Sequence, residues 1–304
     1  MIDIALITDE NYLNQVIITI TSLSLNSNKN KNYNVYVLCN NVAVEKQSLL
    51  KNYSNCNIKI HTIDAQDYIK HFPEFKNGNF HVTKSALIKF YLPVIFKDLD
   101  KILYLDSDIL ILKDLYEINS IDLSDCYIAA VKNSYAYPGA EEYLFKHNIK
   151  TNEYFNSGVM LLNLKKMRED NVSEKLIDYR INNKTFCMDQ DALNAILGKK
   201  IKLLSYRYNL QITPFEDNTF DKFCKLYNDY YAKSKKEALK QAYIMHFADK
   251  NKPWIYNRAK YSKLYKQYWQ KAKLRQKFPK LHEITRQSVL RKIMLTIKLL
   301  FGDF

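Results

Sequence analysis

The sequence predicts an α/β protein with a doubly wound sheet. Short apolar segments alternate with segments of helical spacing from the first residues onward. The connections are long enough for a crossover helix between successive strands, which implies parallel pairing. The apolar run at 101–112 is interrupted only by Asp106, Ser107 and Asp108, and its two halves read as buried strands. We therefore expect the chain to be organised around the strand that ends at Asp106.

The individual elements follow from the period of the apolar residues. Short apolar runs predict strands at 2–8, 33–38, 57–63, 102–105, 109–112, 127–131, 153–164, 201–204 and 242–247. Apolar residues spaced three or four apart predict helices at 14–25, 42–53, 82–96, 172–181 and 187–197. In the helix expected at 82–96, Lys89 lies off the apolar stripe, and a lysine in that position is ordinarily a solvated charge.

The carboxylates of Asp106 and Asp108 are the first candidate site. Residues i and i+2 of a strand point to the same side, so both should face one spot where the strand ends. Two like charges so close repel unless a proton or a cation lies between them. Ligands bind at the carboxyl edge of an open α/β sheet, and hard oxygens suit a divalent cation with room left for phosphate. The alternative is a solvated turn, which the long apolar flanks disfavour.

The first strand also ends in polar residues, at Asp9, Asn11 and Tyr12. Its tip and the Asp106 tip should share one edge of the sheet. Other polar groups have ordinary structural interpretations. Asn156 could bridge backbone groups in a bend, and a histidine at a strand end, such as His246, is more often a core or surface residue.

Composition limits the class of protein. A chain of 304 residues, 47% of them hydrophobic, can form one large or two modest domains with a sizeable core. The five cysteines are scattered and form no CxxC pair, which argues against a disulfide framework or a zinc site and favours reduced thiols in the cytosol. We expect no signal peptide, because the sequence shows no charged n-region followed by an apolar h-region. We expect no membrane span, because no stretch reaches about 20 apolar residues.

The net charge of +14 is concentrated at one end of the chain. Residues 250–304 contain 15 Lys or Arg and 2 Asp or Glu, so the first 249 residues are nearly neutral. Two basic amphipathic helices are expected there, at 261–272 and 288–301, and such helices are typical of binding to anionic membrane surfaces. The alternative is that they pack on the body or on a second subunit. Nucleic acid is not an expected partner, since the neutral body lacks a basic cleft.

Six segments together resemble glycosyltransferase family 8, especially bacterial lipooligosaccharide galactosyltransferases and glucosyltransferases, with glycogenin as a distant member. They recur in the family's order, at 4–12, 85–92, 101–112, 155–164, 188–194 and 246–254. The resemblance implies a GT-A fold, which is a Rossmann-like nucleotide-diphospho-sugar transferase domain with a mixed central sheet. We expect this domain at 1–254, followed by a basic helical tail at 255–304.

The resemblance also implies the site residues. Asp106, Asp108 and His246 match the metal ligands, with Mn²⁺ as the expected ion and Mg²⁺ as the other candidate. Asp9, Asn11 and Tyr12 match positions that hold uracil and ribose, and Lys252 matches the lysine that meets the diphosphate. The remaining nucleotide-sugar-binding positions, most of them around the donor sugar, are Lys89, Asp106, Ser107, Asn156, Asp189 and Gln190.

Three positions depart from the family pattern. Lys89 stands where arginine is usual, and lysine cannot form the same bidentate fork. Asp249 stands where glycine is common beside the diphosphate, and Asn133 stands where relatives can carry aspartate near the acceptor. These departures leave the donor sugar and the acceptor open.

The implied reaction is transfer of galactose or glucose from a UDP-sugar to a glycan or a lipid-linked saccharide, with retention of configuration. The implied setting is lipopolysaccharide or surface polysaccharide synthesis on the inner face of the cell membrane. Gln190 stands where a nucleophile would be needed and is a poor one, so our hypothesis is a front-face route in which Gln190 and Asp189 stabilise the sugar cation. The alternative is a relative that binds nucleotide sugars without turnover. A second enzymatic alternative is a phosphatase that also carries an Asp pair after a strand. That pattern requires Thr or Val four residues after the first Asp, and this chain has Leu110 there, which disfavours it.

Overall fold

The computed structural model describes most of the chain. The described residues are 1–72, 83–134, 140–147, 149, 153–183, 187–212, 215, 220–228, 232–248, 251–256, 259–274 and 276–280. Asp249 and the second expected tail helix at 288–301 lie outside them.

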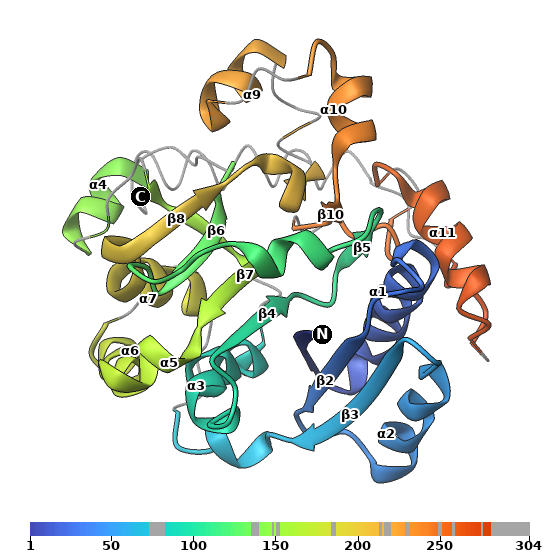
Figure 1. Cartoon of the computed structure of the whole chain (residues 1–304), viewed down its shortest axis with the longest axis horizontal. Coiled ribbons are helices and arrows are strands. Elements are labelled where there is room, and N and C mark those ends of the chain that lie inside the picture. Colours follow the sequence, from blue (N-terminus) through green and yellow to red (C-terminus); the bar gives the residue numbers. More distant parts are fainter. Residues whose placement is uncertain are drawn as a thin grey trace, which may run out of the picture.

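A seven-stranded mixed sheet forms the centre of the molecule (Figure 1), in the order β3-β2-β1-β4-β7-β6-β8. Strands β1, β2, β3 and β4 are parallel, while β7 runs antiparallel to both β4 and β6. The expected strands are confirmed with small shifts in their bounds. They are β1 (Ile2–Thr8), β2 (Tyr33–Cys39), β3 (Ile58–Asp64), β4 (Lys101–Leu105), β6 (Ile128–Lys132), β7 (Phe155–Asn163) and β8 (Ile201–Leu204).

A second sheet of three short strands continues from the end of β4. Its order is β5 (Ile109–Ile111), β10 (Ile244–His246) and β9 (Leu210–Gln211). β10 pairs antiparallel with β5, so that His246 lies opposite Ile109. The chain that leaves β4 therefore meets the C-terminal part of the domain within a few residues.

Helices cover both faces of the central sheet, because its strands bury both sets of alternating side chains. In β1, Ile4 and Leu6 belong to the buried cluster that includes residues of α1 and α11, whereas Ala5 and Ile7 belong to the one that includes residues of α5, α6 and α7. The helices are α1 (Leu13–Asn26), α2 (Val44–Leu50), α3 (Leu92–Ile95), α4 (Ala140–Lys146), α5 (Leu164–Glu169), α6 (Val172–Asn182), α7 (Met188–Leu197), α9 (Phe220–Tyr227), α10 (Lys235–Gln241) and α11 (Ser262–Lys271).

The prediction of a single helix at 82–96 is wrong. The chain instead forms a 3-10 helix at Lys84–Tyr91 followed by the short α3. Pro93 has no N–H to offer the carbonyl of Lys89, which instead accepts from the N–H of Leu92. The tighter winding turns Lys89 inward, and only 4% of its surface is exposed.

The first expected tail helix is present as α11, but its apolar face is not free. Tyr265, Tyr268 and Trp269 are buried in the core, and α11 lies against α1 (Figure 1). Packing on the body, the alternative left open by the sequence, therefore holds for this helix. No helix in the described part of the chain has the length and apolarity to cross a membrane.

Candidate active site

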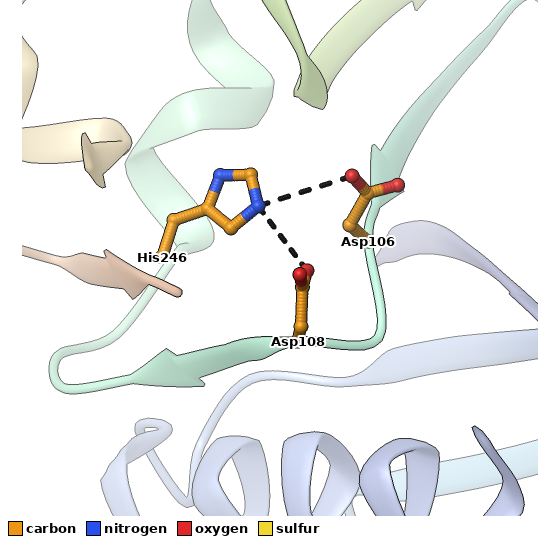
Figure 2. Close-up of side chains that lie close together, drawn as sticks. All are labelled: Asp106, Asp108 and His246. Carbon is orange, nitrogen blue, oxygen red and sulfur yellow. Dashed lines mark ion pairs between the residues drawn. The ribbon is translucent and has the colours of Figure 1, made fainter. Parts of the chain in front are cut away.

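The ends of three strands bring Asp106, Asp108 and His246 together (Figure 2). Asp106 directly follows β4, Asp108 directly precedes β5, and His246 ends β10. The carbonyl of Asp108 accepts from the N–H of Phe247 at 3.0 Å, which holds the two chain segments in register. Nε2 of His246 lies 3.1 Å from Asp108 Oδ1 and 3.9 Å from Asp106 Oδ2. One ligand atom from each residue lies within 4.8 Å of the others, as metal coordination requires.

Each of the two carboxylates has one oxygen fixed by neighbouring side chains. Oδ1 of Asp106 accepts from the hydroxyl of Tyr104 at 2.6 Å and lies 3.2 Å from the ammonium of Lys89. Oδ2 of Asp108 accepts from the ammonium of Lys252. The atoms that face one another, Oδ2 of Asp106, Oδ1 of Asp108 and Nε2 of His246, are the ones left for a ligand.

Gly158 in β7 forms the floor of this cluster. A Cβ atom on Gly158 would lie 2.3 Å from Cε1 of His246 and 2.7 Å from Oδ2 of Asp106. The backbone N–H of Asp106 also donates to the Gly158 carbonyl at 2.7 Å. Only glycine lets the β7 backbone approach so closely without displacing the ligand atoms.

Electrostatics favour an added cation at this cluster. Burial alone would raise the pKa of the Asp108 carboxyl, but Lys252 and His246 outweigh it and lower the pKa. Burial alone would lower the pKa of Lys89, but Asp106 and Asp189 raise it, so the lysine stays charged. Three carboxylates therefore face two ammonium groups, which leaves one negative charge uncompensated when the imidazole is neutral. The mixed carboxylate and imidazole donor set fits a divalent ion such as Mn²⁺ or Mg²⁺.

Lys89 is not the solvated charge that its position in the sequence suggested. Its ammonium lies 2.6 Å from Oδ2 of Asp189 and 3.4 Å from Oγ of Ser157, in addition to its contact with Asp106. It therefore links the first turn of α7 to the end of β4. Asp189 also accepts from the Ser157 hydroxyl at 3.0 Å.

Asp9, Asn11 and Tyr12 lie at the end of β1. Because β1 and β4 are parallel neighbours, this end and the Asp106 end share an edge, as expected. Oδ1 of Asp9 accepts from the N–H groups of Asn11 (3.0 Å) and Tyr12 (3.3 Å), which orders the turn. The Tyr12 ring meets Trp254 edge to face, with 6.1 Å between centroids. Lys252 is 7% exposed and is held by Asp108 and the Phe247 carbonyl.

The polar residues of β7 and α7 form a buried amide network. Oε1 of Gln190 accepts from Asn156 Nδ2 at 3.1 Å and from the N–H of Ser157 at 3.0 Å. Nε2 of Gln190 donates to the Tyr154 hydroxyl, which in turn donates to the fully buried Asp191. Asn156 Nδ2 also lies 3.4 Å from Oδ1 of Asn133.

Two features of the site differ from what the sequence alone suggests. The hydroxyl of Ser107 donates to the carbonyl of Ile7 at 2.6 Å, so it ties β1 to the loop after β4. Asn209, which sequence reasoning missed, is fully buried with its Oδ1 2.9 Å from Nδ1 of His246. It lies just before the two-residue β9, where no period or spacing marks it.

Comparison with known proteins now places the chain in a family. The family model described as "Glycosyl transferase family 8" matches residues 3–258. The chain belongs to glycosyltransferase family 8. The solved structures it resembles include galactosyltransferase LgtC in complex with donor and acceptor sugar analogues, with a TM-score of 0.73 and 21% identity over 91% of this chain and 97% of that one. The bifunctional WbbM structure has a TM-score of 0.73 and 24% identity, over 88% of this chain and 49% of that one. The expected GT-A fold is confirmed.

Curated relatives of this family 8 protein match over shorter stretches. General stress protein A of Bacillus subtilis is 32% identical over 188 residues, which are 58% of this chain and 61% of that protein. Lipopolysaccharide 1,3-galactosyltransferase of Salmonella typhimurium is 28% identical over 178 residues, which are 55% of this chain and 50% of that protein. The chain thus spans about half to three-fifths of the length of these relatives.

Proposed function

We propose that the protein is a metal-dependent, retaining glycosyltransferase that moves galactose or glucose from a UDP-sugar to a glycan or lipid-linked saccharide. The observation that carries the proposal is the convergence of Asp106, Asp108 and His246, with the ligand atoms within 4.8 Å of one another. Family membership supports the reaction class. The names of relatives as lipopolysaccharide glucosyl- and galactosyltransferases support the choice of hexose and setting.

Asp106, Asp108 and His246 would hold the ion. When bound, a divalent cation supplies positive charge that stabilises the departing diphosphate. The protein adds to this the ammonium of Lys252, which is buried beside Asp108 and remains charged because Asp108 offsets the effect of burial and raises its pKa. A fixed positive charge in a dry site stabilises developing negative charge without reorganising.

Asp9, Asn11 and Tyr12 are proposed to bind the nucleoside. The Tyr12 ring is held edge-on by Trp254, which leaves a face for stacking on a base. Asp9 commits one oxygen to the turn, while its other oxygen, Oδ2, lies 3.5 Å from the Ser85 hydroxyl at the same edge. The proposed nucleoside site and the metal ligands lie at the ends of neighbouring parallel strands, β1 and β4.

The donor sugar is proposed to lie between the metal ligands and α7. Both lone pairs of Gln190 Oε1 accept hydrogen bonds from the protein, which supports a positioning role rather than nucleophilic attack. Asp191 is fully buried and bonded to Tyr154, whereas Asp189 is paired with Lys89. We therefore retain the front-face route, in which the leaving phosphate accepts the acceptor's proton and Asp189 stabilises the sugar cation. A glycosyl adduct trapped on Asp189 or Asp191 would contradict it.

The proposal includes a place in the cell, the cytoplasmic face of the cell membrane, where lipid-linked acceptors are available. Its support is the basic segment that follows Trp254. Of the 15 basic residues from 250 onward, 11 lie between 250 and 280. The lysines of α11 are exposed on the side away from the core, as at Lys263, Lys266 and Lys271.

The test measures UDP release and sugar transfer from UDP-galactose and UDP-glucose, with and without Mn²⁺. We expect turnover that stops on chelation, and His246→Ala and Asp108→Asn should lower kcat/KM about 10³-fold, or roughly 4 kcal/mol of barrier. Asp100→Asn is the matched control, because the Asp100 side chain is 80% exposed and has no part in the proposed metal or nucleotide site. Tight UDP binding with no loss of sugar to water or acceptor would favour the non-catalytic binder instead.

Thermal-shift measurements across UDP-sugars with Mn²⁺ would identify the donor. A ligand that binds only the native state raises the apparent stability by mass action, so the correct donor should give the largest shift.

A further inference from the structure

A chain of buried side-chain amides runs from His246 to Gln190. Oδ1 of Asn209 lies 2.9 Å from Nδ1 of His246, and Nδ2 of Asn209 donates to Oδ1 of Asn156 at 2.9 Å. Nδ2 of Asn156 donates in turn to Oε1 of Gln190 at 3.1 Å. Asn209 is fully buried, and Asn156 is 7% exposed. The imidazole of the metal triad is thus connected to the end of the site assigned to the sugar.

The direction of this chain is fixed by two backbone donors. The N–H of Ser157 donates to Gln190 at 3.0 Å, and the N–H of Gly158 donates to Asn156 at 3.1 Å. A backbone N–H can only donate, so the two atoms that accept from it must be the amide oxygens. The atom of Asn209 that faces the Asn156 oxygen must then be its NH₂ group. Its oxygen is left facing His246.

The tautomer of His246 follows from this polarity. An oxygen can only accept, so Nδ1 of His246 must carry the proton that faces Asn209. Nε2 is then the ring nitrogen that faces Asp106 and Asp108 and that is left to bind a metal ion (Figure 2). A histidine that binds a metal through one nitrogen is oriented by the hydrogen bond that the other makes.

We propose that Asn209 is a positioning residue that locks His246 in the Nδ1–H tautomer and so prepares Nε2 to bind the metal ion. The same amide also restrains Asn156, so the metal end and the sugar end are held by one side chain. Partners of this kind commonly contribute about 10- to 100-fold to metal affinity. The inference rests on the metal site of the proposed function.

The experiment compares three variants. Asn209→Leu removes both the acceptor and the donor while keeping the volume similar. Asn209→Asp keeps an oxygen that accepts from Nδ1–H but loses the NH₂ group that donates to Asn156. Gln211→Leu is the matched control, because Gln211 is a buried amide on the adjoining β9 whose partners are Ser134 and Lys132 rather than the triad.

Two readouts are needed, and neither is activity. The first is Mn²⁺ affinity, measured by electron paramagnetic resonance with Mn²⁺ alone and with UDP present. We expect Asn209→Leu to weaken binding at least tenfold, with Asn209→Asp and Gln211→Leu within about threefold of wild type. The second is the ¹⁵N spectrum of the His246 ring in metal-free protein, assigned with His246→Gln. Wild type and Asn209→Asp should show a protonated Nδ1. Asn209→Leu should show less protonation of Nδ1, because Oδ1 of Asp108 lies 3.1 Å from Nε2 and offers the ring proton another acceptor.

The outcomes separate this inference from the proposed function. If wild type binds no Mn²⁺ under either condition, the metal site of the proposed function is wrong, and the ring spectra alone decide whether Asn209 sets the tautomer. If wild type binds and Asn209→Leu binds equally well, the positioning role is overturned. An equal loss of Mn²⁺ affinity in Asn209→Leu and Asn209→Asp would also overturn it, because the oxygen that accepts from Nδ1–H of His246 would then make no difference to metal binding.

Discussion

Lys89 and Asp189, 100 residues apart in the sequence, form a buried ion pair with 2.6 Å between Nζ and Oδ2. The same ammonium lies 3.2 Å from Oδ1 of Asp106. One lysine therefore balances a proposed metal ligand and a proposed sugar-binding acid at once. Because both carboxylates share this ammonium, a change in the charge at the metal end also alters the electrostatic balance at the sugar end.

Removing this ammonium should be costly. Lys89→Met would leave Asp189, whose side chain is 7% exposed, without its counter-charge, and breaking a buried pair in this way typically costs about 3 kcal/mol or more. We expect that loss in the free energy of unfolding by urea in metal-free protein. Lys70→Met is the control, because Lys70 and Asp67 form an exposed pair and should contribute less than about 1 kcal/mol. Equal losses of unfolding free energy in the two variants would show that the buried ion pair stabilises the fold no more than the exposed pair does.

The behaviour of Lys89 shows where sequence reasoning reaches its limit. The local pattern identified the strand and the two carboxylates after it, because those follow from spacing within one segment. The edge shared with Asp9 followed from the rule that parallel strands of an α/β sheet end at the same edge. The burial of Lys89 depends on a carboxylate from α7 and on the winding imposed by Pro93, so no local period reveals it. Asn209 is a sharper case, since its role comes from three elements that meet only in the folded chain. Likewise, the α11 pattern indicated an apolar face but could not say that the body covers it.

Gly158 provides a direct test of the metal site. Gly158→Ala would place Cβ 2.3 Å from His246 and 2.7 Å from Asp106, so one ligand or the β7 backbone must move. We expect Mn²⁺ affinity to fall at least tenfold and sugar transfer with it. Gly198→Ala is the matched control, because an added Cβ there meets nothing within 4 Å and its φ of −59° suits alanine. Wild-type Mn²⁺ affinity in Gly158→Ala would rule out the assigned site.

Asp108 should make the stability of the metal-free protein depend on pH. Burial opposes its ionised form, yet Lys252 and His246 outweigh burial and lower its pKa below the unfolded value of about 4. The stabilisation is therefore complete above that unfolded value and is lost as the pH falls through the lower native pKa. We expect Asp108→Asn to reduce the free energy of unfolding most at pH 7, with a smaller difference from wild type at pH 3. Urea unfolding at the two pH values measures this, and a difference that does not shrink in acid would contradict it.

The basic surface of α11 can be tested without disturbing the core. A chain ending near Trp254 would strip Tyr265 and Trp269 from the core, so loss of membrane binding in it would be ambiguous. Three exposed lysines offer a cleaner change: Lys263 in α11, and Lys273 and Lys277 just after it. Replacing all three by glutamine should weaken sedimentation with phosphatidylserine-containing vesicles by about 3 kcal/mol, or roughly a hundredfold, at about 1 kcal/mol per lysine near the surface.

Two controls decide what that result means. Vesicles of neutral phosphatidylcholine should bind neither protein well, because the attraction is to anionic lipid and is screened by salt. A chain ending at Lys280 keeps α11 and its lysines but lacks 281–304, where the second amphipathic helix is expected. If this shorter chain binds as well as the full chain while the glutamine variant does not, the lysines in and just after α11 supply the membrane contact. If the glutamine variant binds as well as wild type, Lys263, Lys273 and Lys277 have no part in membrane attachment.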